Sequence, residues 1–205
     1  MALRIEDYAV IGDTHTVALV GRNGSIDWLC LPSFDSGACF AALLGEPRHG
    51  RWLLAPQGEV KGSRRHYRDG TLVLDTELDA DEGTVRLVDF MPHREDAPAL
   101  IRIVEGVRGR VPMRMELVMR FDYGSIVPWV RRVEDALWAA AGPDSLVLRT
   151  PVETRGEDMT TVADFTVGEG DRVPFVLTWH PSHEPIPKPT DAFEAVEDTE
   201  GWWRE

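Results

Sequence analysis

Carboxylates are the side chains of this sequence best suited to chemistry, because a well-placed pair can act as general acid and general base in hydrolysis. The acids considered for such a pair are Asp27, Asp35, Asp75, Glu77, Asp89, Glu116 and Asp122. Most of them fall at alternating, outward-facing positions of apparent strands or in turns, where charged side chains normally meet solvent. We therefore expect a charged outer surface, and we name no catalytic residue.

Histidine and cysteine could also support catalysis or metal binding, but their spacing does not favour either. The six histidines are scattered and show no paired spacing of the kind that zinc sites use. Ser182-His183-Glu184 are neighbours in a proline-rich segment, so they are not held in the geometry of a catalytic triad. Cys30 and Cys39 are interpreted as buried free thiols rather than as a disulfide. We expect no metal site and no cofactor.

A hairpin around Asn23-Gly24 is the element about which the chain is expected to be arranged. This dipeptide separates two apolar runs and favours a type I′ turn, in which both central residues have a positive φ. The turn would place Leu19 opposite Trp28, and Val20 opposite Asp27. Both faces of the hairpin are mostly apolar, which predicts cover on both sides.

Asp27 is the one acid on an otherwise apolar face of this hairpin. Arg22 lies diagonal to it, so we expect Asp27 to be shielded and paired with Arg22 or with backbone donors. A carboxylate kept for chemistry is the alternative. The following loop, residues 31–37, carries an aromatic residue beside an acid and is the better candidate for contact outside the domain. The candidate residues for substrate or domain contact are Trp28, Asp27, Phe34 and Asp35.

The rest of the chain is a series of short, alternating segments separated by turns. Residues 111–121 alternate over eleven positions and predict a long strand, preceded by a separate strand over 100–107 and a turn at Arg108-Gly109. A short helix is expected over 38–44. About a dozen strands predict an all-β fold, a large antiparallel β-sandwich over residues 1–180.

Residues 181–205 follow a different pattern. Prolines crowd the first half, which predicts a stiff linker, and a helix capped by Asp191 follows. Trp202 and Trp203 cannot both lie on one helix face, and Phe193 adds further apolar area. A finished domain rarely ends in this way. We expect a proline-rich linker and the start of a helix leading to a larger domain, which these three aromatic residues would contact.

Charge and hydropathy exclude several classes of partner. With 35 acids and 22 bases, the formal net charge is −13, which disfavours nucleic acids and anionic membranes. No run approaches the roughly 18 apolar residues of a membrane helix, and no secretory signal opens the chain. We expect a cytoplasmic protein. The aromatic C-terminal residues could fold back on the sandwich, pair with a second copy or remain disordered beyond the linker. A homo-oligomer in which a second copy covers them is the favoured arrangement.

The stretch IGDTHTVALVGRNGSIDWLCLPSFDSGACFAALLG, residues 11–45, resembles the opening of bacterial proteins in glycoside hydrolase family 15. The segments GTLVLDTEL, GTVRLVDFMPHR, RVPMRMELVMRFDYG, PWVRR and VPFVLTWHPSHEP are similar too, so the resemblance covers essentially the whole chain. The family includes trehalases, glucoamylases and glucodextranases whose β-domain precedes an α-helical catalytic barrel. Ser33 departs from the family pattern LPRFDS, so no role of an arginine at that position carries over.

The resemblance implies a supersandwich-like β-domain that scaffolds the barrel and is inactive alone, since the family's catalytic glutamates belong to the barrel. For the full-length parent it implies inverting hydrolysis of α-glucosides such as trehalose or maltooligosaccharides. Two alternatives stay open. A stand-alone carbohydrate-binding module predicts affinity for a glycan, and an assembly module predicts oligomer formation through an apolar surface.

Overall fold

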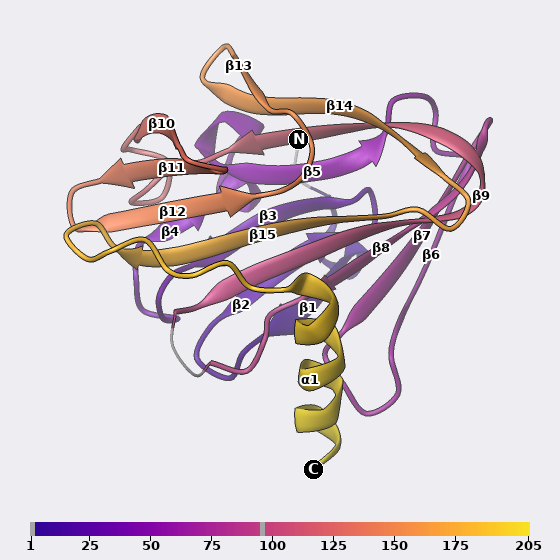
Figure 1. Ribbon diagram of the computed structural model, residues 1–205, viewed down its shortest axis with the longest axis horizontal. Coiled ribbons are helices and arrows are strands. Elements are labelled where there is room, and N and C mark those ends of the chain that lie inside the picture. Colours follow the sequence, from indigo (N-terminus) through magenta and orange to yellow (C-terminus); the bar gives the residue numbers. More distant parts are fainter. Residues whose placement is uncertain (1–2, 95–96) are drawn as a thin grey trace.

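The computed structural model describes residues 3–94 and 97–205. Within them, fifteen antiparallel strands form a continuous sheet that folds over on itself into two layers, followed by one α-helix (Figure 1). The predicted all-β sandwich is confirmed. Three short 3-10 helices cover Ile5–Asp7, Ala42–Leu44 and Pro47–His49.

The two layers share the long strand β9. The first layer consists of β1 (Tyr8–Gly12), β2 (Val17–Gly21), β3 (Ser25–Cys30), β4 (Ala38–Phe40), β5 (Arg51–Pro56), β13 (Arg155–Glu157), β14 (Thr160–Gly168) and the second half of β9 (Ala99–Val118). The second consists of β6 (Gly62–Tyr67), β7 (Leu74–Ala80), β8 (Gly83–Phe90), β10 (Trp129–Val133), β11 (Ala136–Ala141), β12 (Asp144–Arg149), β15 (Arg172–Pro181) and the first half of β9. The main hydrophobic core fills the space between the layers.

Strand β9 differs from the two strands and intervening turn that the sequence predicts. It is continuous, and its first half pairs with β8 and β15 while its second half pairs with β5 and β14. Gly109 has a φ of 75°, so the chain bends there without reversing. A Cβ on Gly106 would collide with the carbonyl oxygen of Gly168. The predicted turn at Arg108-Gly109 is wrong, because Gly109 allows the strand to bend and Gly106 allows its backbone to approach that of Gly168 closely.

The β2–β3 hairpin is present, but its turn is not of type I′. The N–H of Gly24 donates to the carbonyl oxygen of Gly21 at 3.0 Å, which makes Arg22 and Asn23 the central residues. Only Gly24 has a positive φ, 82°, so the turn is followed by a left-handed glycine bulge. The carbonyl oxygen of Gly24 also accepts a hydrogen bond from Leu54 of β5. Contact with a third strand therefore selects this turn.

The bulge changes the register of the hairpin. Leu19 opposes Trp28 as predicted, but Val20 opposes Ile26 instead of Asp27. Ile26 consequently turns into the main core, where its side chain is fully buried. The predicted short helix over 38–44 is also wrong in its first half, because residues 38–40 form β4 on the edge of β3 and all three side chains are buried. Pairing with β3 overrides the local preference there.

A buried ion pair ties the layers together. Arg102 of β9 donates to the carboxylate of Asp89 at 2.7 Å and to the carbonyl oxygens of Trp52 and Gly24 at 2.7 and 2.9 Å. Both charged side chains are completely buried. We expected Asp89 on the charged outer surface, and that expectation is wrong. Asp89 lies on the same face of β8 as Leu87, which belongs to the main core, so its side chain points between the layers, where the turn of the hairpin and β5 enclose the ion pair.

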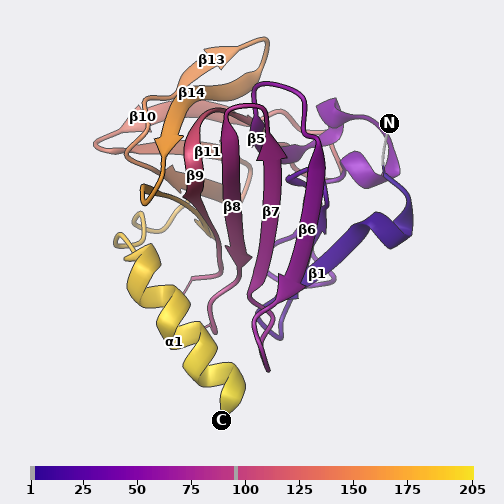
Figure 2. The ribbon, with the colours of Figure 1, turned by 90° about the vertical axis from the view of Figure 1, so that its right-hand side faces the viewer.

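Helix α1 (Ala192–Arg204) packs on the outer face of the second layer, beside β8 and β9 (Figure 2). Asp191 caps it, accepting from the backbone N–H groups of Phe193 and Glu194, as the sequence predicts. Its buried residues join a second hydrophobic cluster that contains Phe90 and Ile101. The last helix thus belongs to the packing of the sandwich. No helix within the described ranges is long and apolar enough to cross a bilayer.

Candidate functional site

Asp27 is shielded, as expected, but its partners differ from the prediction. Its side chain is 6% exposed and accepts hydrogen bonds from the hydroxyls of Tyr8, at 2.6 Å, and of Ser25. Arg22 instead pairs with Asp7 at 3.0 Å, so the predicted pairing with Arg22 is wrong. Burial and the neighbouring Asp27 raise the pKa of Tyr8. This carboxylate holds the first strand against the hairpin.

The loop over residues 31–37 presents its aromatic residue to solvent. Phe34 is 60% exposed, and Asp35 beside it is also exposed. The backbone N–H of Phe34 donates to the carbonyl oxygen of His15, which fixes the loop against the start of β2. Trp28 is half-buried on the outer side of β3, where its ring lies 6.1 Å from that of Tyr123. The loop and the outer side of β3 therefore offer a partly aromatic surface.

Two further loops extend this surface. The N–H of Tyr123 donates to the carbonyl oxygen of Ala38 at 3.1 Å, so the segment after β9 adjoins the loop that carries Phe34. Trp129, at the start of β10, is 84% exposed. We call this region the end surface; its exposed apolar residues are Phe34, Leu44, Tyr123, Ile126, Val127, Trp129, Val130 and Met159. Sequence reasoning found only Phe34, although the apolar run from Ile126 to Val130 was a usable signal.

Most strand carboxylates on the outer faces are paired with arginines. Arg114 lies 2.9 Å from Glu157 and 3.2 Å from Asp164, and Arg86 lies 2.8 Å from Glu77. Hydrogen bonds from arginine lower the pKa of Glu77, Glu157 and Asp164. A general acid needs the opposite shift, a raised pKa. These acids are arranged for ion pairing rather than for proton donation.

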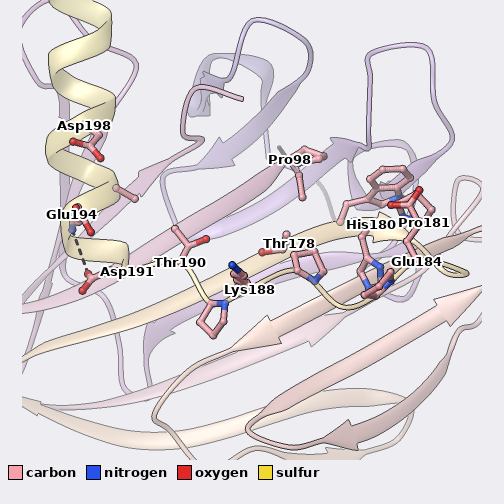
Figure 3. A pocket seen from close by; sticks show the side chains of 16 residues that line it. Pro98, Thr178, His180, Pro181, Glu184, Lys188, Thr190, Asp191, Glu194 and Asp198 are labelled. Carbon is pink, nitrogen blue, oxygen red and sulfur yellow. Dashed lines mark hydrogen bonds between the residues drawn. The ribbon is translucent and has the colours of Figure 1, made fainter. Parts of the chain in front are cut away.

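A groove of about 1040 Å³ lies between the end of β15, the proline-rich segment and α1 (Figure 3). Figure 3 shows His180, Glu184 and Lys188 along one part of it, and Glu194 and Asp198 on the helix. His180 is buried, which lowers its pKa, and neither ring nitrogen has a hydrogen-bond partner within the described residues. No cluster of three metal-binding side chains occurs in the part of the chain that the structure describes. The carboxylates and the lysine in the lining of the groove can form hydrogen bonds with a bound ligand.

Phe193, Trp202 and Trp203, which the sequence predicts to contact a further domain, are partly covered by side chains of this chain. The ring of Trp202 stacks on that of His93, with 4.2 Å between the ring centroids. The ring of Trp203 meets the Trp202 ring edge-on, with 4.8 Å between their centroids. The guanidinium of Arg172 lies 4.4 Å from the centre of the Phe193 ring. Both tryptophans stay partly exposed. Their contact with a further domain or a second copy stays a prediction.

Comparison with known proteins gives consistent matches. Residues 1–184 match the family described as trehalase-like, N-terminal. A trehalase of Mycobacterium tuberculosis is 29% identical over an alignment of 228 positions, which covers 98% of this chain and 33% of that protein. Trehalase 2 of Sulfolobus acidocaldarius is 34% identical over 120 residues, covering 58% of this chain and 19% of the relative.

The fold also has a solved counterpart. A bacterial glucoamylase crystallised with acarbose superimposes with a TM-score of 0.56 at 10% identity, covering 96% of this chain and 34% of that one. The chain thus spans about a fifth to a third of the length of the curated relatives that it matches.

Proposed function

The chain belongs to the trehalase-like N-terminal domain family, and on that premise we propose that it is a non-catalytic scaffold for the helical catalytic domain of a glycoside hydrolase. The full-length protein would hydrolyse α-glucosides with inversion. Trehalose is the first candidate substrate, because the matched relatives are named trehalases, and maltooligosaccharides are the second. A cytoplasmic location, inferred from the sequence, belongs to the same proposal.

The end surface is the observation that carries the scaffold role. Folded proteins rarely leave large apolar side chains concentrated over neighbouring loops unless another surface covers them. Trp129 and Phe34 are the kinds of residue that anchor interfaces, because each offers a large, rigid apolar area. The proposed partner is the catalytic domain, which would cover these loops.

The scaffold role can be tested in the longer polypeptide that carries the catalytic domain. Replacing Phe34 and Trp129 together with serine should lower the thermal midpoint of the catalytic domain, because the interface loses apolar area. Ile5→Ser is the matched control, since Ile5 is 71% exposed and lies outside the end surface. Equal midpoints for the double variant and the control would contradict the proposal.

The non-catalytic role has a separate test on the chain alone. Because its strand acids are held in arginine pairs, the purified chain should release no glucose from trehalose, maltose or starch above a buffer blank. The measurement is a coupled glucose assay. Glucose release that co-purifies with the chain would overturn the assignment.

Sugar binding is a second candidate function, favoured by the groove of Figure 3. Calorimetric titration with trehalose and maltose distinguishes it from the scaffold role. Saturable binding that Glu194→Gln weakens, while the exposed Glu59→Gln does not, would support a carbohydrate-binding module. If no heat of binding is measured at millimolar trehalose or maltose, the carbohydrate-binding function is excluded and only the scaffold role remains.

A further inference from the structure

Arg120 is a buried cation without a carboxylate partner. Its side chain, just beyond the end of β9, is 8% exposed. Its Nη1 donates to the carbonyl oxygens of Met119, at 2.7 Å, and Met159, at 3.4 Å, and the guanidinium forms no ion pair with any residue that the structure describes. The other buried arginine, Arg102, pairs with Asp89. Burial lowers the pKa of Arg120, because no counter-charge offsets the loss of hydration.

Arg120 forms part of the wall of a small apolar pocket. The pocket has a volume of about 250 Å³. Its apolar lining comes from Leu117, Met119, Val127, Val130 and Met159. The Nε and Nη2 groups of Arg120 donate no hydrogen bond to any residue that the structure describes. A planar guanidinium with free donors binds a carboxylate in two-pronged geometry. The pocket is therefore suited to a carboxylate on a short apolar stem.

The position of the pocket indicates a protein as the source of that carboxylate. Val127, Val130 and Met159 belong both to the pocket and to the end surface, so the pocket opens within a wider apolar area. A free metabolite would fill the pocket and leave that surrounding area exposed. In a chain of net charge −13, a buried cation without a carboxylate partner also helps to set where an acidic partner side chain can dock.

We propose that this pocket receives an aspartate or glutamate side chain of the catalytic domain. The proposal rests on the scaffold function and adds the residue that determines the register of docking. Two-thirds or more of the length of the matched relatives lies outside the region that this chain covers, so a partner domain of sufficient size is part of such proteins.

The pocket itself can be tested on the isolated chain with butyrate as the probe. Titration followed by the ¹⁵N resonance of the Arg120 Nε–H should show a saturable shift, and butyramide at equal ionic strength should show none. Arg120→Met should abolish the protection that butyrate gives against thermal unfolding. Arg120→Lys, which keeps the charge without the two-pronged geometry, should weaken binding by about tenfold or more. Arg110→Met removes an exposed arginine and should bind as the wild type does.

If the Arg120 resonance does not respond to butyrate, the proposal that this pocket binds a carboxylate is wrong. The scaffold role would then still be decided by the Phe34 and Trp129 double variant, so the two failures are distinguishable.

The identity of the group that occupies the pocket is tested by calorimetry of the longer polypeptide. Arg120→Met should separate the unfolding of the two domains, whereas Arg110→Met should not. Butyrate binding without any change in domain coupling would overturn the protein occupant in favour of a free carboxylate ligand.

Discussion

At the scale of single residues, the protein stabilises buried carboxylates in two different ways. Asp89 is matched by the charge of Arg102, whereas Asp27 accepts hydrogen bonds from the neutral hydroxyls of Tyr8 and Ser25. Breaking a buried ion pair costs about 3–5 kcal/mol, because the remaining charge is left uncompensated. Removing an acceptor from neutral hydroxyls costs less, about 1–3 kcal/mol per buried group. Asp27 should therefore matter to stability, but less than Asp89.

The first prediction concerns Asp27→Ala. It leaves the hydroxyls of Tyr8 and Ser25 without their acceptor, so the free energy of unfolding should fall by about 1–3 kcal/mol. For a domain of this size, that lowers the thermal midpoint by roughly 3–10 °C. Differential scanning calorimetry measures it, with Arg22→Ala as control, because the Arg22 side chain is 51% exposed and its pair contributes little. Equal midpoints for the two variants would show that the burial of Asp27 is unimportant.

At the scale of elements, β9 is the centre of the fold, in place of the hairpin that the sequence suggested. It is the strand that pairs in both layers, and its bend requires residues without a side chain. The outer faces of its neighbours are held by arginine–carboxylate networks that cross several strands. Close backbone packing at the glycines of β9 and ion pairs between neighbouring strands therefore both stabilise the sheets.

A second prediction follows for the bend. Gly106→Ala places a methyl group against the carbonyl oxygen of Gly168, so either the strands separate or the backbone shifts. Overpacking of this kind costs about 1–3 kcal/mol. Urea denaturation should show the loss, and Gly58→Ala should be close to neutral because nothing lies within 4 Å of its added Cβ. A Gly106→Ala midpoint equal to that of Gly58→Ala contradicts the close approach.

A third prediction concerns acid stability. Arg86 and Arg64 lower the pKa of folded Glu77 below its ordinary value of 4.5, so the fold favours the ionised carboxylate. The resulting stability is present above pH 4.5 and is lost as the pH falls through the lowered pKa of the folded state. Glu77→Gln should destabilise the protein at pH 7, by about 1 kcal/mol, and should flatten the loss of stability as the pH falls below the ordinary pKa of 4.5. Parallel acid profiles for the wild type and Glu77→Gln, with Glu59→Gln as control, would rule this out.

At the scale of the whole molecule, the sandwich has one covered outer face and one exposed end. Helix α1 covers part of the second layer with its own apolar side, including Val196. The end surface has no such cover within the described residues. A partner domain that docks there would bury the aromatic loops and the uncompensated charge of Arg120 together.

Self-association of the chain stays a prediction, and the structure changes how to test it. Deleting residues 190–205 would also uncover Val88 and Ile101, because α1 covers them. Trp203→Ser is the cleaner change, since it removes a partly exposed aromatic residue at the end of the helix. If a second copy covers this residue, sedimentation should show weaker association in Trp203→Ser than in the wild type. The same monomer in both samples would exclude association through Trp203.

The sequence by itself determined the features that depend on near neighbours. Alternating polarity identified residues 111–118 as strand, and Asp191 was recognised as the helix cap. Such patterns work because each depends on side chains a few positions apart. They also led to the expectation of an all-β sandwich, and the resemblance over residues 11–45 led to its family.

Only the tertiary structure decided the features that depend on contacts between distant segments. The glycine bulge of the hairpin turn is selected by β5, and the single strand β9 is selected by its partners in both layers. Asp89 looks like a surface acid in the sequence, yet Arg102 and the turn at Gly24 enclose it. Arg120 stands in an ordinary strand pattern, and its missing counter-charge becomes visible only when residues 117–130 and 156–161 come together. Pairing, enclosure and charge balance are properties of the assembled fold, so no local pattern in the chain encodes them.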